Sequence, residues 1–106
     1  MTNSRAKGAR GERELSNLLK RAGFETRRGQ QYCGANGDAD VVGIHGIHIE
    51  CKRVEHLNLY KAMEQAKTDA KENEKPTVFH RKDRQEWLVT MTLDDWIEMY
   101  KKAEKK

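Results

Sequence analysis

The segment of residues 37–53, GDADVVGIHGIHIECKR, constrains the fold of this 106-residue chain more than any other. Its β-branched residues predict two buried strands joined by a tight turn. These residues are Val41, Val42, Ile44, Ile47 and Ile49. Charged residues nevertheless interrupt the apolar pattern, at Asp38, Asp40, Glu50 and Lys52. Because charges are costly inside a sheet, their presence in this segment calls for an explanation.

The turn of this hairpin decides which charged side chains meet. Residues two apart in a strand face the same side, so Glu50 and Lys52 point together. A two-residue turn would pair Asp40 with Cys51, whereas an odd loop centred on His45 would pair Asp40 with Glu50. Directly opposed carboxylates repel each other, so the odd loop predicts a bound metal ion. An ordinary surface ion pair of Glu50 with Lys52 is the alternative.

Hydrophobic periodicity predicts three helices and five strands in the order α, β, β, β, α, β, β, α. The helices are expected at residues 6–22, from 59 to before Pro76, and from 93 onward after a capping box of Thr92 and Asp95. The strands are expected at residues 24–28, twice within 39–54, and at 77–80 and 87–91. A glycine-rich loop separates the first two strands. The pattern predicts one mixed α/β domain over residues 1–106, with a central sheet flanked by helices.

The first helix carries an acid near its apolar side. At 100° per residue, Glu12 lies on the same side as Leu15 and Leu19. Gly8 and Gly11 share that side and would let the helix approach another backbone closely. Glu12 could also be a boundary residue with its carboxylate in solvent.

Composition and charge distribution favour a nucleic-acid partner. Hydrophobic and charged residues each make up 36% of the chain, so the core is small and a partner chain could enlarge it. Residues 1–28 hold eight Lys and Arg against three Glu, whereas residues 29–60 hold two basic against four acidic residues. A basic flank beside an acidic patch fits a polyanion next to divalent cations, and a solvated surface is the plain alternative.

Hydrophobic runs and cysteine content indicate where in the cell the protein is expected. The chain has no apolar run of membrane-spanning length and no secretory signal, which predicts a cytosolic protein. Cys33 and Cys51 form neither a disulfide framework nor a CxxC zinc motif, so both are expected to be free thiols.

Two blocks of the sequence together resemble a known superfamily. GARGEREL at residues 8–15 is followed by DVVGIHGIHIECK at residues 40–52. This arrangement resembles the PD-(D/E)XK nucleases, and most closely the small archaeal-type Holliday junction resolvases and their phage-encoded relatives. The resemblance implies a restriction-endonuclease-like fold and a homodimer that uses Mg²⁺, or Mn²⁺ in its place, to cut branched DNA. It also implies work in DNA recombination and repair, in the host cytoplasm if the protein is phage-encoded.

The resemblance assigns catalytic roles to Glu12, Asp40, Glu50 and Lys52. Asp40, Glu50, Glu12 and the backbone carbonyl of Cys51 would hold the metal ion, and Lys52 would orient or deprotonate the attacking water. The DNA contacts expected from the sequence are Arg5, Lys7, Arg10, Arg13, Arg53 and Gln65. A second basic patch would be formed by Arg81, Lys82 and Arg84. The spacing from Asp40 to Glu50 is shorter than in the archaeal resolvases, and the glycine-rich loop is longer.

Other interpretations stay open from the sequence alone. The chain could be a nicking, flap-cutting or restriction-type nuclease, or a noncatalytic basic module that binds DNA. Asp38 is expected to be a turn residue that could assist Asp40. His45 and His48 are expected in the turn and on the surface, and Trp87 and Trp96 in the core.

Overall fold

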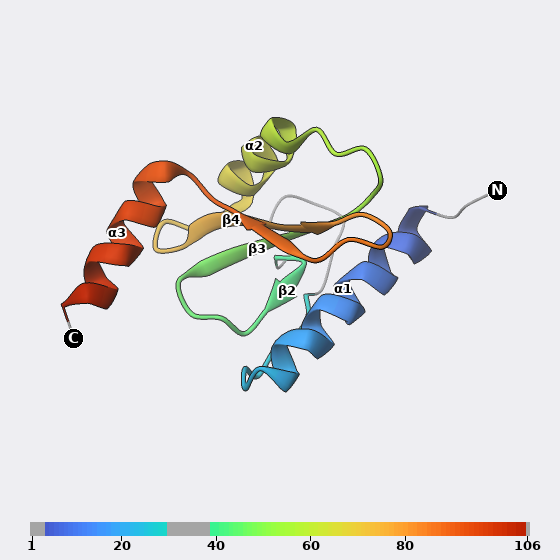
Figure 1. The fold of residues 1–106 in the computed structure, drawn as a ribbon, viewed down its shortest axis with the longest axis horizontal. Coiled ribbons are helices and arrows are strands. Elements are labelled where there is room, and N and C mark those ends of the chain that lie inside the picture. The colour runs from blue at the N-terminus through green and yellow to red at the C-terminus, as the bar shows by residue number, and fades with distance from the viewer. Residues whose placement is uncertain (1–3, 30–38, 106) are drawn as a thin grey trace.

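The computed structural model describes residues 4–29 and 39–105, and the side chains from Gly8 onward. Three helices and five strands follow one another in the predicted order (Figure 1). The helices are α1 (Ser4–Arg21), α2 (Leu59–Asp69) and α3 (Leu93–Glu104). The strands are β1 (Arg27–Arg28), β2 (Val41–Val42), β3 (Ile47–Arg53), β4 (Lys75–Arg81) and β5 (Leu88–Thr90).

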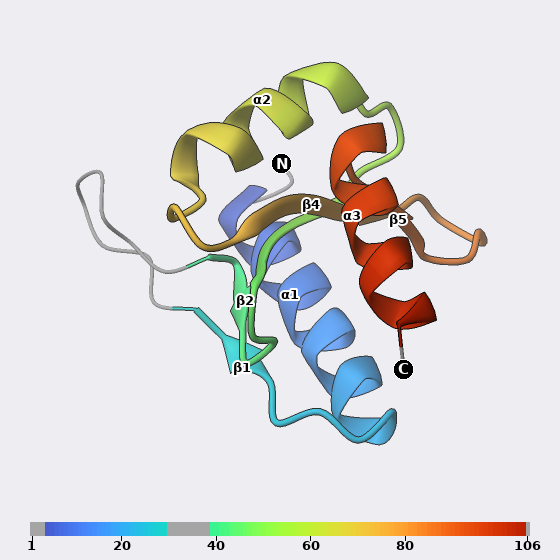
Figure 2. The same cartoon turned by 90° about the vertical axis from the view of Figure 1, so that its left-hand side faces the viewer.

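The five strands form one sheet in the sequential order β1-β2-β3-β4-β5. Strands β3 and β4 run parallel and are connected through α2, whereas all other neighbours are antiparallel. Helices α1 and α2 cover opposite faces of the sheet (Figure 2). The predicted fold class, a mixed sheet of five strands with flanking helices, is confirmed.

The two faces of the sheet carry separate apolar clusters. On the α1 side, Leu15 packs with Val41, Ile49 and Cys51. On the α2 side, Val78 packs with three helix residues, which are Ala62, Met63 and Ala66. The odd-numbered residues of β3 therefore face α1, while its even-numbered residues face α2, which confirms the alternation expected from the sequence.

Local signals end and begin the helices as expected. Gly23 follows α1 with a φ of 106°, a left-handed conformation that favours glycine. The side chain of Thr92 accepts a hydrogen bond from the backbone N–H of Asp95 and so caps α3. Helix α2 ends at Asp69, before Pro76 as expected. Several strand boundaries differ from the predictions: β1 is limited to Arg27–Arg28, and β4 is longer than expected.

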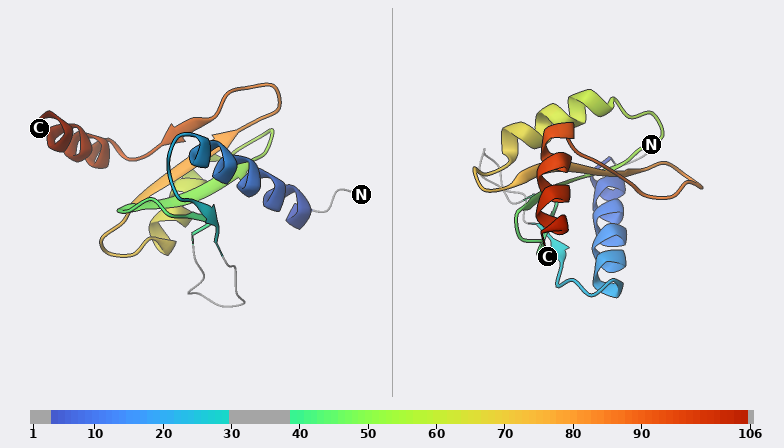
Figure 3. Two further views of the ribbon diagram at one scale, coloured as in Figure 1. Left: turned by 90° about the horizontal axis from the view of Figure 1, so that it is seen from below. Right: turned by 60° about the vertical axis from the view of Figure 1, so that its left-hand side comes forward.

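Helix α3 lies to one side of the sheet (Figure 3). None of its residues is buried, and Trp96 is 53% exposed. The prediction of Trp96 as a core aromatic is therefore wrong, whereas Trp87 does pack against the cluster around Leu15. Lys75 of β4 holds α3 in place through an ion pair of 2.8 Å with Glu98.

Gly8 and Gly11 were both expected to let α1 approach another backbone closely. Only Gly11 does so. A Cβ at Gly11 would lie 2.6 Å from the Cβ of Arg53, whereas one at Gly8 would meet nothing within 4 Å. The start of α1 therefore contacts β3 directly at Gly11, and the prediction for Gly8 is wrong. Among the residues described, no helix has the length and apolar character needed to cross a membrane.

Candidate active site

The hairpin of β2 and β3 has the odd register. Val41 pairs with Ile49, so the antiparallel register is centred on His45, and Asp40 lies close enough to Glu50 for their charges to interact. The backbone N–H of Asp40 donates at 3.1 Å to the carbonyl of Ile49, the residue that already pairs with Val41, so the strand is irregular at Asp40, as at a bulge. Gly46, with a φ of 81°, supplies the left-handed position of the turn. The turn therefore brings the carboxylates of Asp40 and Glu50 close enough to share one site.

The carboxylate of Asp40 lies in an unfavourable electrostatic environment. Burial raises its pKa to about 7, and the neighbouring charges of Glu50 and Glu12 add to this effect. A hydrogen bond of 2.8 Å from the backbone N–H of Cys51 and the charge of Lys52 act in the opposite direction without cancelling it. Two clustered acids of this kind are relieved either by a proton on one of them or by a shared cation, and the donor set fits a hard divalent metal ion.

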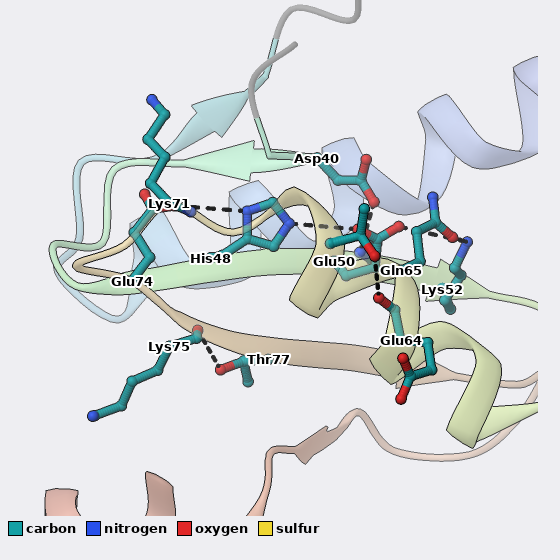
Figure 4. A network of polar contacts seen from close by, with 12 residues as sticks. Asp40, His48, Glu50, Lys52, Glu64, Gln65, Lys71, Glu74, Lys75 and Thr77 are labelled. Atoms are coloured by element: carbon teal, nitrogen blue, oxygen red, sulfur yellow. Dashed lines mark hydrogen bonds and ion pairs between the residues drawn. The ribbon is translucent and has the colours of Figure 1, made fainter. Parts of the chain in front are cut away.

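Glu50 and Lys52 extend from the α2 face of β3 beside Asp40 (Figure 4). Glu50 is buried, and its Oε2 lies 3.6 Å from the Nζ of Lys52. The same Nζ donates to Oε1 of Gln65 on α2 at 3.2 Å. Lys52 is thus held between an acid and an amide, with its ammonium partly shielded from solvent.

The backbone of Cys51, on the central strand β3, lies beside Asp40. The carbonyl of Ile49 points to the β2 side, and the alternation along a strand directs the carbonyl of Cys51 to the same side. Its thiol faces α1 instead, where burial raises the pKa well above its usual range. Cys51 is a free thiol as predicted, and it can offer the site a carbonyl oxygen but not a thiolate.

Glu12 reaches the neighbourhood of Asp40 from α1. Its Oε1 forms an ion pair of 3.1 Å with the Nε of Arg28 on β1, and its charge raises the pKa of Asp40. Glu12 is half-buried, as the helical spacing suggested. The structure therefore brings Asp40, Glu50 and Lys52 together, with Glu12 directed to Arg28.

The comparisons with known proteins agree with this geometry. Residues 3–106 match the model of a family described as "Phage putative PDDEXK endonuclease". The chain belongs to this family. A solved structure of Hjc from Archaeoglobus fulgidus, described as a Holliday junction resolvase from an archaeal hyperthermophile, aligns with a TM-score of 0.60 and 29% identity. The alignment covers 80% of this chain and 72% of that one, and a search of curated proteins gave no significant match.

The membership identifies the protein as a nuclease of the PD-(D/E)XK type with a restriction-endonuclease-like fold. In this nuclease, the segment DVVGIHGIHIECK, on which the resemblance rests, brings Asp40, Glu50 and Lys52 close together beside the central strand β3. The resemblance seen in the sequence is therefore confirmed.

The basic residues expected to bind DNA differ in whether they are exposed or already paired with acidic residues. Arg10 and Arg13 are exposed on α1, whereas the side chains of Arg5 and Lys7 lie outside the described part. Arg53 belongs to an ion-pair network with Glu14, Glu55 and Asp83, the last at 2.8 Å. Arg53 would have to exchange these partners in order to contact a phosphate. Arg81 also pairs with Glu14, at 3.2 Å.

His48 was expected at the surface, and this prediction is wrong. His48 lies on β3 and is only 3% exposed, because it faces the turn that follows α2. Burial lowers the pKa of its imidazole, but the charges of Glu50, Glu74 and Asp69 outweigh this effect and raise the pKa. His45 is exposed in the turn as expected, while Asp38 and Cys33 lie outside the described residues.

Sequence reasoning also missed the role of Arg28, because the sequence places this residue only in the basic flank. The single clue in the sequence is its place on the strand that follows the first helix. The distance between Arg28 and Glu12 could not be inferred without the contact between α1 and β1.

Proposed function

We propose that this nuclease is a Mg²⁺-dependent endonuclease that cuts branched DNA, such as a four-way junction, as a homodimer. The observation that carries the proposal is the proximity of Asp40 to Glu50, with the Nζ of Lys52 3.6 Å from the latter. The similarity to an archaeal Holliday junction resolvase supports the branched substrate. A phage enzyme with this activity would act in the host cytoplasm, in recombination or repair of DNA.

Asp40 and Glu50 would hold Mg²⁺, or Mn²⁺ in its place, with Glu12 and the carbonyl of Cys51 as further oxygen ligands. Such an ion supplies a Lewis acid for the nonbridging phosphate oxygens. Glu12 pairs with Arg28 through Oε1, so it would reach the ion with its other carboxylate oxygen or by turning away from the arginine. All proposed ligands are oxygen atoms, which is the set that Mg²⁺ prefers.

Lys52 would act on the attacking water and offset negative charge on the phosphate. Glu50 holds the ammonium from one side and Gln65 from the other, so the side chain is oriented before substrate binds. A preoriented cation stabilises a developing charge without reorganisation during the reaction. Gln65 therefore positions Lys52, in addition to the DNA contact predicted from the sequence.

The surface beside Lys52 can receive a DNA backbone. A depression of about 250 Å³ opens there between β3 and α2, and its lining includes Lys52, Asn58, Lys61 and Gln65. Two lysines and two amides offer donors to phosphate oxygens and no acidic repulsion. Arg10 and Arg13 on α1 would contact further phosphates, together with Arg5 and Lys7.

The homodimer would form through α3. An apolar stripe on this helix is exposed, with Leu93 70% and Trp96 53% accessible. The other members of this stripe are Ile97 and Tyr100. Symmetric resolution of a junction needs two nicks, and each chain has one proposed site, so a second copy of the chain is the occupant that the function requires. Exposed apolar patches of this kind are typical of interaction surfaces.

Sedimentation velocity tests this dimer. Trp96→Ala should shift the protein from dimer to monomer, because large aromatic residues carry much of the energy of an interface. Lys101→Ala, an exposed polar position on the same helix, is the matched control and should remain dimeric. A wild-type protein that is monomeric at all concentrations would contradict the dimer while leaving the proposed chemistry untouched.

Cleavage of four-way, flap and linear duplex DNA in the presence of Mg²⁺ tests the activity. We expect the wild-type protein to cut the four-way junction fastest and Lys52→Ala to bind it without cutting. Preference for flap or linear DNA would indicate another nuclease of the same superfamily. Binding without cleavage of any substrate by the wild-type protein would indicate a noncatalytic module.

A further inference from the structure

A second group of potential ligands lies on the other side of Glu50. It is centred on His48, whose Nε2 is buried and, among the described residues, without a hydrogen-bond partner. Buried polar atoms are nearly always paired, so an unpaired imidazole nitrogen calls for an explanation. The nitrogen faces Oε1 of Glu50 at 3.6 Å, which is beyond hydrogen-bond distance (Figure 4).

Asp69 completes a set of three ligands. It is the last residue of α2, and ligand atoms of His48, Glu50 and Asp69 all lie within 4.8 Å of one another. A tetrahedral ion with bonds of 2.0–2.1 Å would separate its ligands by about 3.3 Å. The pair of His48 and Glu50 is close to this spacing already, and the exposed side chain of Asp69 can close the remaining gap by a rotation.

A carboxylate also lies behind the imidazole. The Nδ1 of His48 is 3.8 Å from Oε1 of Glu74, and this oxygen accepts a hydrogen bond of 3.0 Å from the backbone N–H of Lys71. At 3.8 Å this contact is also longer than a hydrogen bond, and a small movement of the ring would let Nδ1 donate to the carboxylate. Histidines that bind metal ions usually donate their second N–H in this way, which leaves the other nitrogen free to coordinate. The arrangement therefore presents Nε2 as the coordinating atom.

We propose that His48, Glu50 and Asp69 form a binding site for Zn²⁺, with Glu74 orienting the histidine. Imidazole with carboxylates suits zinc, whereas Mg²⁺ prefers oxygen ligands alone. Three protein ligands leave a fourth position open to water. Because Glu50 directs Oε1 to His48 and Oε2 to Lys52, its carboxylate would bridge the zinc site and the proposed catalytic site.

The proposal does not depend on DNA cleavage, so it is tested on the protein alone. Zinc affinity is measured by competition with a chromophoric chelator, on untagged protein carrying Cys33→Ser so that this thiol does not contribute. Asp69→Asn is the main variant, because it should leave the fold intact. Asp69 is exposed, and the loss of a negative charge at the C-terminus of α2 does not oppose the helix dipole. Glu64→Gln removes an exposed acid from the same helix and is the matched control.

We expect one equivalent of Zn²⁺ to bind to the parent protein and to Glu64→Gln with the same affinity. Asp69→Asn should bind it at least about tenfold more weakly, since changes even outside the ligand shell cost about 10 to 100-fold. Equal zinc affinity in Asp69→Asn and the parent, or no zinc binding by the parent, would overturn the proposal.

Nuclear magnetic resonance of the imidazole nitrogens identifies the histidine involved. The chain has four histidines, and His48→Gln assigns the resonances of the buried ring. Zn²⁺ should shift Nε2 of His48 and leave the exposed rings of His45 and His56 unchanged. A zinc-induced shift confined to the other histidines would refute the assignment.

Discussion

Replacement of Asp40 by asparagine removes one of the two opposed charges at the proposed active site. Asparagine preserves the size of the side chain, and its amide oxygen can still accept the hydrogen bond from the N–H of Cys51. The pKa of Asp40 is about 7 in the folded protein, whereas the ordinary pKa of an aspartate is 3.8. The variant therefore isolates the electrostatic cost of the ionised carboxylate.

The sign and size of this cost follow from proton linkage. Between pH 4 and 7 the folded state binds more protons than the unfolded state at this group, so its contribution to stability falls as the pH rises. At about 1.4 kcal/mol for each pKa unit, the full difference corresponds to about 4 kcal/mol at pH 8. At pH 5 the folded wild-type protein keeps the Asp40 proton and most of this cost is absent.

Urea unfolding in the presence of EDTA measures the effect. We expect Asp40→Asn to be more stable than wild type at pH 8, by up to about 4 kcal/mol, and the gain to shrink at pH 5. Glu64→Gln, at an exposed acid of α2, should change little at either pH. A variant that is equally or less stable than wild type at pH 8 would refute the electrostatic reasoning.

Addition of Mg²⁺ should invert the comparison. A ligand that binds only the folded state stabilises it according to its concentration relative to its Kd. Mg²⁺ should therefore stabilise the wild-type protein at pH 8 and leave Asp40→Asn nearly unchanged. Equal stabilisation of both proteins would mean that Asp40 does not hold the ion.

Three further predictions concern packing, capping and DNA binding. Gly11→Ala should lower the free energy of unfolding by about 1 to 3 kcal/mol, because its Cβ would meet that of Arg53, whereas Gly8→Ala should be neutral or stabilising in the same urea assay. Thr92→Ala should cost about 1 kcal/mol through loss of the α3 cap, seen as faster amide exchange in the first turn of that helix. Arg13→Ala should weaken binding to all DNA sequences and reduce the slope of log affinity against log salt by about 0.9, and an unchanged slope would exclude a phosphate contact.

The sequence narrowed the register of the hairpin to two alternatives and supplied the signal for the observed one, because the register depends on local chemistry. Strand parity places Glu50 and Lys52 on one face, and Gly46 supplies the left-handed residue that an odd loop needs. The same local rules predicted the cap at Thr92 and the end of α1 at Gly23. Signals of this kind involve residues within a few positions of each other, so no knowledge of the packing is required.

The errors have in common that they depend on contacts between distant elements. Periodicity identifies the apolar stripe of α3 but cannot say whether it packs against its own sheet, so Trp96 was assigned to the core. His48 lies two residues before Glu50 and therefore faces the same side of β3. The burial of His48 nevertheless depends on where α2 ends and the chain turns back. Gly8 and Gly11 share a side of α1, and only the crossing point with β3 distinguishes them.

The central claim is that Asp40 and Glu50 together hold a divalent ion. Crystals of Lys52→Ala soaked in Mn²⁺ and measured near the manganese absorption edge test it directly. An anomalous peak contacting both carboxylates, on the side to which the carbonyl of Cys51 points, is the predicted result. A peak that contacts neither acid, or no peak between them under saturating Mn²⁺, would contradict the account.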